Sequence, residues 1–284
     1  MHDDCRPCLA ILGSRYRHPG LATHTGLSNN GVTMTRNDYL TRDPEIRASL
    51  ALASEGTAYF DRTLAQLPDV ELDGSSLLPG WSRRHVIAHV CYNALGLLRL
   101  VHWASTGIET PMYPSSEARD AEIEEGAALP PGELRALVVR TSNELDGGWR
   151  GLTDEAWHAR VRMSQGPDFP ATTTIWLRTR EVWLHAVDLN SGATCDDFPP
   201  ALIDRLLSNV LSAWRGRAAE ENIPNIVLSP IDRGVPKGIG DADDPAAIVL
   251  RGTAVDLARW ATGRGVLGIT AANGKPVPVA PRWI

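Results

Sequence analysis

The sequence has no long hydrophobic run. Its longest apolar stretch, residues 94–104, is interrupted by Gly96, Arg99 and His102, whereas a helix that crosses a bilayer needs about 20 consecutive apolar residues. The short apolar segment at residues 8–12 is too short and has the wrong flanks for a secretory signal. We therefore expect no membrane attachment and no export, and we expect a cytoplasmic protein.

Cysteine and lysine are scarce. Four cysteines in 284 residues do not indicate a disulfide scaffold, which a chain of this length does not need, so reduced thiols are expected. Cys5 and Cys8 form a lone C-x-x-C pair, and neither a second pair nor a βαβ pattern supports a zinc or redox site there. Lysine occurs only at Lys237 and Lys275, and the net charge is −6. Because phosphate binding needs clustered basic residues, we expect no nucleic-acid partner.

The composition that remains is that of a globular protein, with 43% hydrophobic and 22% charged residues. Residues 14–32 are polar and show no periodicity, so residues 1–33 are predicted to be a disordered leader, with Met34 as a candidate true start. Residues 34–195 are predicted to form a helical bundle. Residues 196–284 alternate short strands and helices, which indicates a small C-terminal α/β domain and an α+β class overall.

Helix-start signals divide the first region. Asp43 can cap a helix that Pro44 opens, with Glu45 facing the positive end of the helix dipole, and this helix should extend to about residue 67. A second start follows Trp81, and apolar residues at helical spacing continue to about residue 105. Further helices are expected at 115–125, 130–145, 172–189, 200–219 and 254–264, a hairpin at 158–167, and strands at 225–228, 247–250 and 268–271. The first region therefore reads as a four- or five-helix bundle.

Two of these helices carry possible metal ligands. His85 and His89 are four residues apart, and Glu181 and His185 repeat this spacing. Because each residue of a helix advances by about 100°, both pairs present their side chains on one face. Facing helices with such pairs can close a metal site inside a bundle. Imidazole with carboxylate suits Zn²⁺, and three protein ligands leave one coordination position open for catalysis.

Spacing alone leaves four candidate ligands and does not choose between His85 and His89. Position weakly favours His89, which is one turn deeper into the apolar part of the helix. Asp188 lies seven residues after Glu181, where it could accept the second N–H of a ligand histidine. The alternative is that these are ordinary solvated pairs on helix surfaces, although their apolar neighbours would bury them.

Four segments carry a more specific pattern. They are Leu78–Val90 (LPGWSRRHVIAHV), Glu109–Tyr113 (ETPMY), Leu177–Leu189 (LRTREVWLHAVDL) and Ala261–Gly265 (ATGRG). Together they resemble the mycothiol-dependent maleylpyruvate isomerases of the DinB-like family, from about Met34 to Ile284. The resemblance implies a DinB-like bundle of four main helices followed by a small α/β domain. It also implies a zinc ion bound by His89, Glu181 and His185, and a functional Arg264 that contacts the substrate or the thiol.

The reaction that this resemblance implies is the cis–trans isomerisation of maleylpyruvate to fumarylpyruvate in gentisate breakdown, with mycothiol as cofactor. Zinc would keep the thiol ionised at neutral pH. Addition of the thiolate to the conjugated double bond would permit rotation, and elimination would give the trans isomer. The expected partners are thus a small dicarboxylate and a low-molecular-weight thiol. The sequence does not give the oligomeric state, and a monomer is compatible with it.

A dicarboxylate substrate needs cationic side chains, preferably guanidinium groups. Arg264 and Arg178 are the candidates. Arg178 precedes Glu181 by three residues and is expected on the metal-binding face, with a surface ion pair as the alternative. Tryptophans at 81, 176 and 183 could line the pocket or belong to the core.

Two other functions fit the same pattern. One is a mycothiol-dependent S-transferase of the DinB-like family that acts on another electrophile. The other is a non-catalytic metal-binding or ligand-binding module, which would bind metal without turnover.

Overall fold

The computed structural model describes residues 39–163, 166–234, 237–241 and 244–283. The predicted leader at 1–33 and the pair formed by Cys5 and Cys8 lie outside these residues. None of the helices in the described ranges combines the length and the apolar character that a bilayer span requires. Cys91 and Cys195 are buried free cysteines, as expected.

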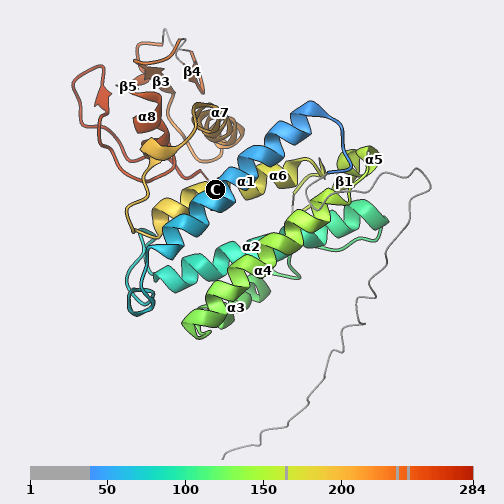
Figure 1. The fold of residues 1–284 in the computed structure, drawn as a ribbon. Helices are drawn as coiled ribbons and strands as arrows, with labels where there is room; N and C mark the ends of the chain where they lie inside the picture. Colours follow the sequence, from blue (N-terminus) through green and yellow to red (C-terminus); the bar gives the residue numbers. More distant parts are fainter. Residues whose placement is uncertain (1–38, 164–165, 235–236, 242–243, 284) are drawn as a thin grey trace, which may run out of the picture. The chain divides into compact units, whose positions relative to one another are not determined.

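Four long helices form the N-terminal part of the described chain (Figure 1). α1 (Pro44–Ala65) packs along α6 (Thr173–Asp188), while α2 (Arg83–Thr106) packs against both α6 and α4 (Pro131–Arg150). The shorter α3 (Ser116–Ala127) covers α2, and α5 (Asp154–His158) precedes a small hairpin. α2 therefore lies between three partner helices, and α6 contacts two.

The ends of the helices follow their sequence signals. The Asp43 carboxylate accepts hydrogen bonds from the backbone N–H groups of Glu45 and Ile46 and thereby caps α1. Ser82 and His85 form a reciprocal capping box at the start of α2, and Gly107 ends that helix in the left-handed conformation at φ 74°. The predicted helices at 43–67 and 82–105 are thus confirmed to within two residues at each end.

A glycine permits the close approach of α1 and α6. A Cβ at Gly56 would lie 2.5 Å from Trp183 Nε1, so no other residue fits there without movement. The indole of Trp183 stacks on Tyr59, with ring centroids 4.8 Å apart, and donates a hydrogen bond to Leu52 O. These contacts fix α6 against α1.

A short hairpin and a small sheet complete the structure. β1 (Arg160–Val161) and β2 (Phe169–Pro170) are antiparallel, so the expected hairpin is present, with its second strand just beyond the predicted range. The C-terminal sheet has the order β4-β3-β5-β6, where β3 (Ile226–Pro230) and β5 (Ile248–Gly252) are parallel. β4 (Lys237–Gly238) and β6 (Thr270–Ala271) add antiparallel edges.

One helix, α8 (Ala254–Ala261), packs against β3 and β5 of this sheet, and α7 (Pro200–Arg217) packs against α8. α7 and α8 contact through Trp214 and Trp260, whose rings meet edge to face at 5.6 Å. Two 3₁₀ turns, Asp69–Glu71 and Cys195–Asp197, join the longer elements. The expected α+β class is confirmed. Residues 39–284 form one compact unit, and a domain boundary between residues 195 and 196 stays a prediction.

α8 is shorter than predicted. The expected helix at 254–264 ends at Ala261, because Gly263 and Gly265 adopt φ values of 79° and 122°, which are outside the helical region. Arg264 therefore lies in a glycine-rich loop rather than on a helix. This loop reaches α6 through the hydrogen bonds of Arg264 with Asp188.

Candidate metal centre

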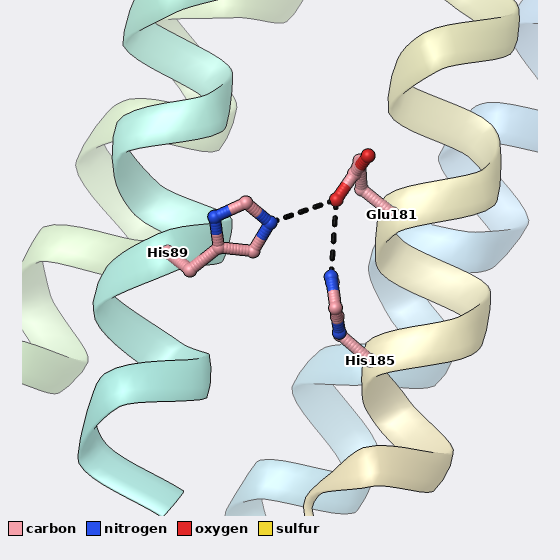
Figure 2. A group of neighbouring side chains, drawn as sticks. All are labelled: His89, Glu181 and His185. Atoms are coloured by element: carbon pink, nitrogen blue, oxygen red, sulfur yellow. Dashed lines mark hydrogen bonds and ion pairs between the residues drawn. The ribbon is translucent and has the colours of Figure 1, made fainter. Parts of the chain in front are cut away.

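Three side chains from two helices converge at one point between α2 and α6 (Figure 2). His89 Nε2 lies 2.9 Å from Glu181 Oε2, and His185 Nε2 lies 3.0 Å from the same oxygen. One ligand atom from each residue falls within 4.8 Å of the other two. The spacing of four residues between Glu181 and His185 places them one turn apart on α6, with His89 opposite them on α2.

Burial and hydrogen bonding shift the pKa values of the three side chains in different directions. Burial lowers the pKa of His89, and it does so more strongly than the hydrogen bond with Glu181 raises it. Burial also disfavours the charged form of His185, but hydrogen bonds with Asp188 and Glu181 raise its pKa above the usual value. For Glu181, burial is outweighed by the hydrogen bonds from both histidines, which hold its pKa well below the usual range. Glu181 is therefore an ionised, buried acceptor between two imidazoles.

Asp188 links His185 to the C-terminal part of the chain. Its Oδ2 lies 2.8 Å from His185 Nδ1, and its side chain is fully buried. Arg264 binds the same carboxylate through two nitrogens, with Nε 3.0 Å from Oδ1 and Nη2 2.5 Å from Oδ2. Although burial raises the pKa of Asp188, the hydrogen bond from His185 and the charge of Arg264 bring it below the usual value. The resulting carboxylate accepts the Nδ1 proton of His185 and leaves Nε2 directed at Glu181.

His85 is outside this group. Its Nδ1 lies 2.6 Å from Ser82 Oγ, in the capping box of α2, and its Nε2 lies 3.4 Å from Glu124 Oε2. Within the part of the chain that the structure describes, the group that could hold a metal contains His89, Glu181 and His185 alone. The two histidines that spacing could not separate therefore have different surroundings.

The donor set suits a small divalent cation. Ligands about 2.0–2.2 Å from a tetrahedral zinc ion are about 3.3 Å from one another, which is close to the separations of 2.9 and 3.0 Å measured from Glu181 Oε2. Two imidazole nitrogens and one carboxylate oxygen match the ligands that zinc takes in catalytic sites, and the adjoining cavity leaves room for a fourth ligand. The residues present therefore fit a bound zinc ion.

A cavity of about 650 Å³ opens beside these three residues. Its apolar wall includes Leu78, Leu177 and Leu184, and its aromatic wall includes Trp81, Tyr113 and Trp283. Its basic side chains come from separate elements: Arg119 on α3, Arg180 on α6, Arg264 in the loop after α8, and Arg282 near the C-terminus. The volume is within the range of about 300–1,000 Å³ that is typical of small-molecule sites.

Comparisons with known proteins agree with this arrangement. A family model described as the mycothiol maleylpyruvate isomerase N-terminal domain matches residues 53–190. The crystal structure of the mycothiol-dependent maleylpyruvate isomerase is similar to this chain with a TM-score of 0.78 and 39% identity, over 84% of this chain and 97% of that chain.

This chain belongs to the mycothiol-dependent maleylpyruvate isomerase family. A histidine-to-alanine mutant of the same crystallised isomerase gives the same TM-score, identity and coverage. No curated protein matched the sequence.

Of the two arginines expected at the family's substrate site, Arg264 lines the cavity and Arg178 does not. The nitrogens of Arg264 are engaged by Asp188 and by Thr262 O, which is 2.8 Å from Nη1. Arg178 does not line the metal cavity. Its Nη1 donates to Val90 O at 2.6 Å, its Nη2 donates to Ser142 Oγ at 3.2 Å, and the side chain is almost completely buried. Arg178 lies nearly one helical turn before Glu181 along α6, where its side chain contacts α2 and α4 rather than the cavity.

The three tryptophans divide between pocket and core. Trp81 lines the cavity and lies beside His89, with ring centroids 5.5 Å apart. Trp176 and Trp183 are buried in the hydrophobic core and do not line the cavity. Of the three tryptophans, only Trp81 lines the described cavity.

Several residues of the cavity were missed from the sequence. Arg119 Nη2 lies 3.3 Å from His89 Nδ1, and Arg180 Nε lies 3.5 Å from Glu181 Oε1. The only signal for Arg180 was its place next to a ligand candidate. Trp283, two positions after Pro281 in a segment without helix or strand, carried no local pattern that could have indicated a site.

Proposed function

We propose that this protein catalyses the zinc- and mycothiol-dependent cis–trans isomerisation of maleylpyruvate to fumarylpyruvate, a step of gentisate breakdown, in the cytoplasm. The observation that carries the proposal is the convergence of His89, Glu181 and His185 beside a cavity of about 650 Å³. It is supported by 39% identity to a mycothiol-dependent maleylpyruvate isomerase over most of both chains.

When bound, the zinc ion and the thiol together supply an ionised sulfur nucleophile at neutral pH, able to add reversibly to a conjugated double bond. The residues of the chain hold the metal and orient its ligands. Asp188 accepts from Nδ1 of His185, which keeps Nε2 of that ring free to bind metal. Arg264 fixes the Asp188 carboxylate in turn.

The side chains that line the cavity would surround the thiol and the substrate. Leu78, Leu177 and Leu184 line it with apolar surface, which excludes water from a charged nucleophile and strengthens electrostatic interactions inside. Arg119 and Arg180 place positive charge along the same cavity, as a dianionic substrate requires. The site therefore combines a metal position, apolar walls and basic side chains.

A mycothiol-dependent S-transferase is the second candidate. The observation that favours it is the size of the cavity, which has room for an electrophile larger than a small diacid beside the thiol. The metal site and the thiol would be the same, and only the second reactant would differ.

The test is a product assay with purified, zinc-loaded protein. Maleylpyruvate is supplied with mycothiol, and the vinyl proton coupling in the NMR spectrum distinguishes the cis from the trans product. We expect conversion that stops when the thiol is omitted or a chelator removes the metal, and that returns when zinc is restored. Consumption of a thiol-reactive electrophile without isomerisation would favour the S-transferase. Stoichiometric zinc with neither activity would indicate a non-catalytic module.

A further inference from the structure

Arg180 lies in the wall of the metal cavity, and its buried Nε has no hydrogen-bond partner among the described residues. Its side chain is 16% exposed, and among the described residues it makes no hydrogen bond. Its contacts are Glu181 Oε1, 3.5 Å from Nε, and the ring of Trp283, whose centroid is 5.6 Å from the guanidinium carbon. Since a largely buried guanidinium is expected to have hydrogen-bond acceptors, its free donors point to a ligand that supplies them.

Trp283 presents a second free donor to the same cavity. Its side chain is buried, and its Nε1 has no hydrogen-bond partner in the described part of the chain. The other buried indole with this property, that of Trp157, does not line the cavity. Because a buried indole N–H usually has an acceptor, Trp283 also lacks a partner that a bound molecule could provide.

The C-terminal segment that carries Trp283 is held by side chains of two helices. On α7, Arg217 Nη1 donates to Trp283 O at 3.1 Å and Trp214 Nε1 donates to Pro281 O at 3.2 Å. On α8, Trp260 Nε1 donates to Pro278 O at 2.8 Å. The position of Trp283 against Arg180 is therefore built by the fold, although the segment itself belongs to no helix or strand.

The other basic side chains of the cavity already have anionic or polar partners. Arg264 is paired with Asp188, Arg282 with Glu221, and Arg119 with Asp120 and the ring of His89. Arg180 has only a long contact to the Glu181 carboxylate, which is shared with two histidines. Of the arginines that line the described cavity, Arg180 is the one that makes no hydrogen bond to another described residue.

We infer that Arg180 and Trp283 bind one carboxylate group of the dicarboxylate substrate. A carboxylate is an acceptor with two oxygens, and a guanidinium beside an indole N–H offers a charged donor group and a neutral donor group. This inference rests on the proposed function for the identity of the substrate. It makes the C-terminal segment a part of the binding site.

A purely supporting role for Arg180 gives a different expectation. If Arg180 served only to hold Glu181 through the 3.5 Å ion pair, its removal would weaken metal binding, and Trp283 would have no part in ligand affinity. Carboxylate affinity and zinc retention must therefore be measured separately in the same variants.

The experiment is calorimetric titration of zinc-loaded, full-length protein with maleate, a four-carbon cis-dicarboxylate, in the absence of thiol. Maleamide, its uncharged diamide, serves as the control ligand. The variants are Arg180→Gln, which removes the charge, and Trp283→Phe, which keeps an aromatic ring against the guanidinium and removes the N–H together with the pyrrole ring. Arg205→Gln is the matched control, because Arg205 also stacks on a tryptophan, 4.4 Å from the Trp176 ring, but lies outside the metal cavity.

We expect Arg180→Gln to weaken maleate binding about tenfold or more, as for loss of a hydrogen bond to a charged group. Trp283→Phe should weaken it about fivefold, as for loss of a neutral donor. Both variants should retain the zinc content of the wild type, and Arg205→Gln should bind maleate as the wild type does. The titration with maleamide should give the same result for all of the proteins.

Three results would overturn the inference: no maleate binding by the wild type, unchanged affinity in either cavity variant, or zinc loss in Arg180→Gln that accounts for its lost maleate binding. Failure of the proposed function would look different. In that case the wild type would bind maleate through Arg180 and Trp283 but would not isomerise maleylpyruvate.

Discussion

Asp188 and Arg264 form a two-point ion pair that joins the end of α6 to the glycine-rich loop after α8. The residues are 76 positions apart, and both carboxylate oxygens are engaged, at 3.0 and 2.5 Å. Asp188 also accepts from His185. Arg264 is therefore linked to the candidate metal position through Asp188 and His185, and it also lines the cavity.

The first prediction concerns Asp188→Asn. The amide can offer an N–H to His185 Nδ1 and so favour the tautomer that places a proton on Nε2, where the metal should bind. We expect zinc affinity to fall by about tenfold to a hundredfold, measured by competition with a chromophoric chelator. Asp196→Asn is the control, because Asp196 is an exposed aspartate that also pairs with an arginine, Arg259. Equal zinc affinity of Asp188→Asn and Asp196→Asn would show that Asp188 does not support metal binding.

The second prediction separates the two histidines of α2. His89→Ala should lose bound zinc because His89 faces Glu181 and His185, whereas His85→Ala should retain it. Elemental analysis of the purified variants measures the difference. His85→Ala should instead lower the free energy of unfolding by about 0.5–2 kcal/mol, as loss of a helix cap does, because His85 closes the capping box with Ser82. Comparable zinc loss in both variants would contradict the assignment of His89.

Much of this site followed from local sequence patterns. The helix-start signals at Asp43 and Ser82 fixed the ends of α1 and α2, and the spacing of four residues placed Glu181 and His185 on one face of α6. The same pattern could not choose between His85 and His89, since both lie on one face of α2. That choice depends on which turn of α2 meets α6, and this is a tertiary contact.

The contacts that local patterns did not indicate have the same physical origin. Arg178 shares α6 with the ligands and lies only about 20° around the helix from His185, but it is seven residues, or about 10 Å, farther along the axis. Its guanidinium therefore enters the interface with α2 and α4. The resemblance implied a substrate or thiol contact for Arg264, and no local pattern indicated its pairing with Asp188, 76 positions away. Trp283 was missed because a segment without periodicity gives no sign of what it packs against.

The third prediction tests this placement of Arg178. Arg178→Met keeps much of the side-chain volume but leaves Val90 O and Ser142 Oγ without their donor. We expect the free energy of unfolding, measured by urea denaturation, to fall by about 3 kcal/mol, with zinc content and the affinity for maleate unchanged in the folded protein. Arg205→Met, at an exposed position, should be close to neutral. A selective loss of maleate binding in Arg178→Met would restore Arg178 as a substrate contact.

The fourth prediction concerns the contact that fixes α6, the helix that carries two of the three proposed ligands. In Gly56→Ala the new methyl would lie 2.5 Å from Trp183 Nε1 and 2.6 Å from Val182 Cγ2. We expect a loss of about 1–3 kcal/mol in the free energy of unfolding, because both neighbours are buried and the helices must move apart. Gly147→Ala is the control: it also replaces a helical glycine, but its Cβ meets no atom within 4 Å. That variant should be unchanged or more stable by up to about 1 kcal/mol, since alanine favours the helix. If Gly56→Ala matched Gly147→Ala in thermal denaturation, α1 and α6 would have to lie farther apart than the stacking of Tyr59 on Trp183 requires.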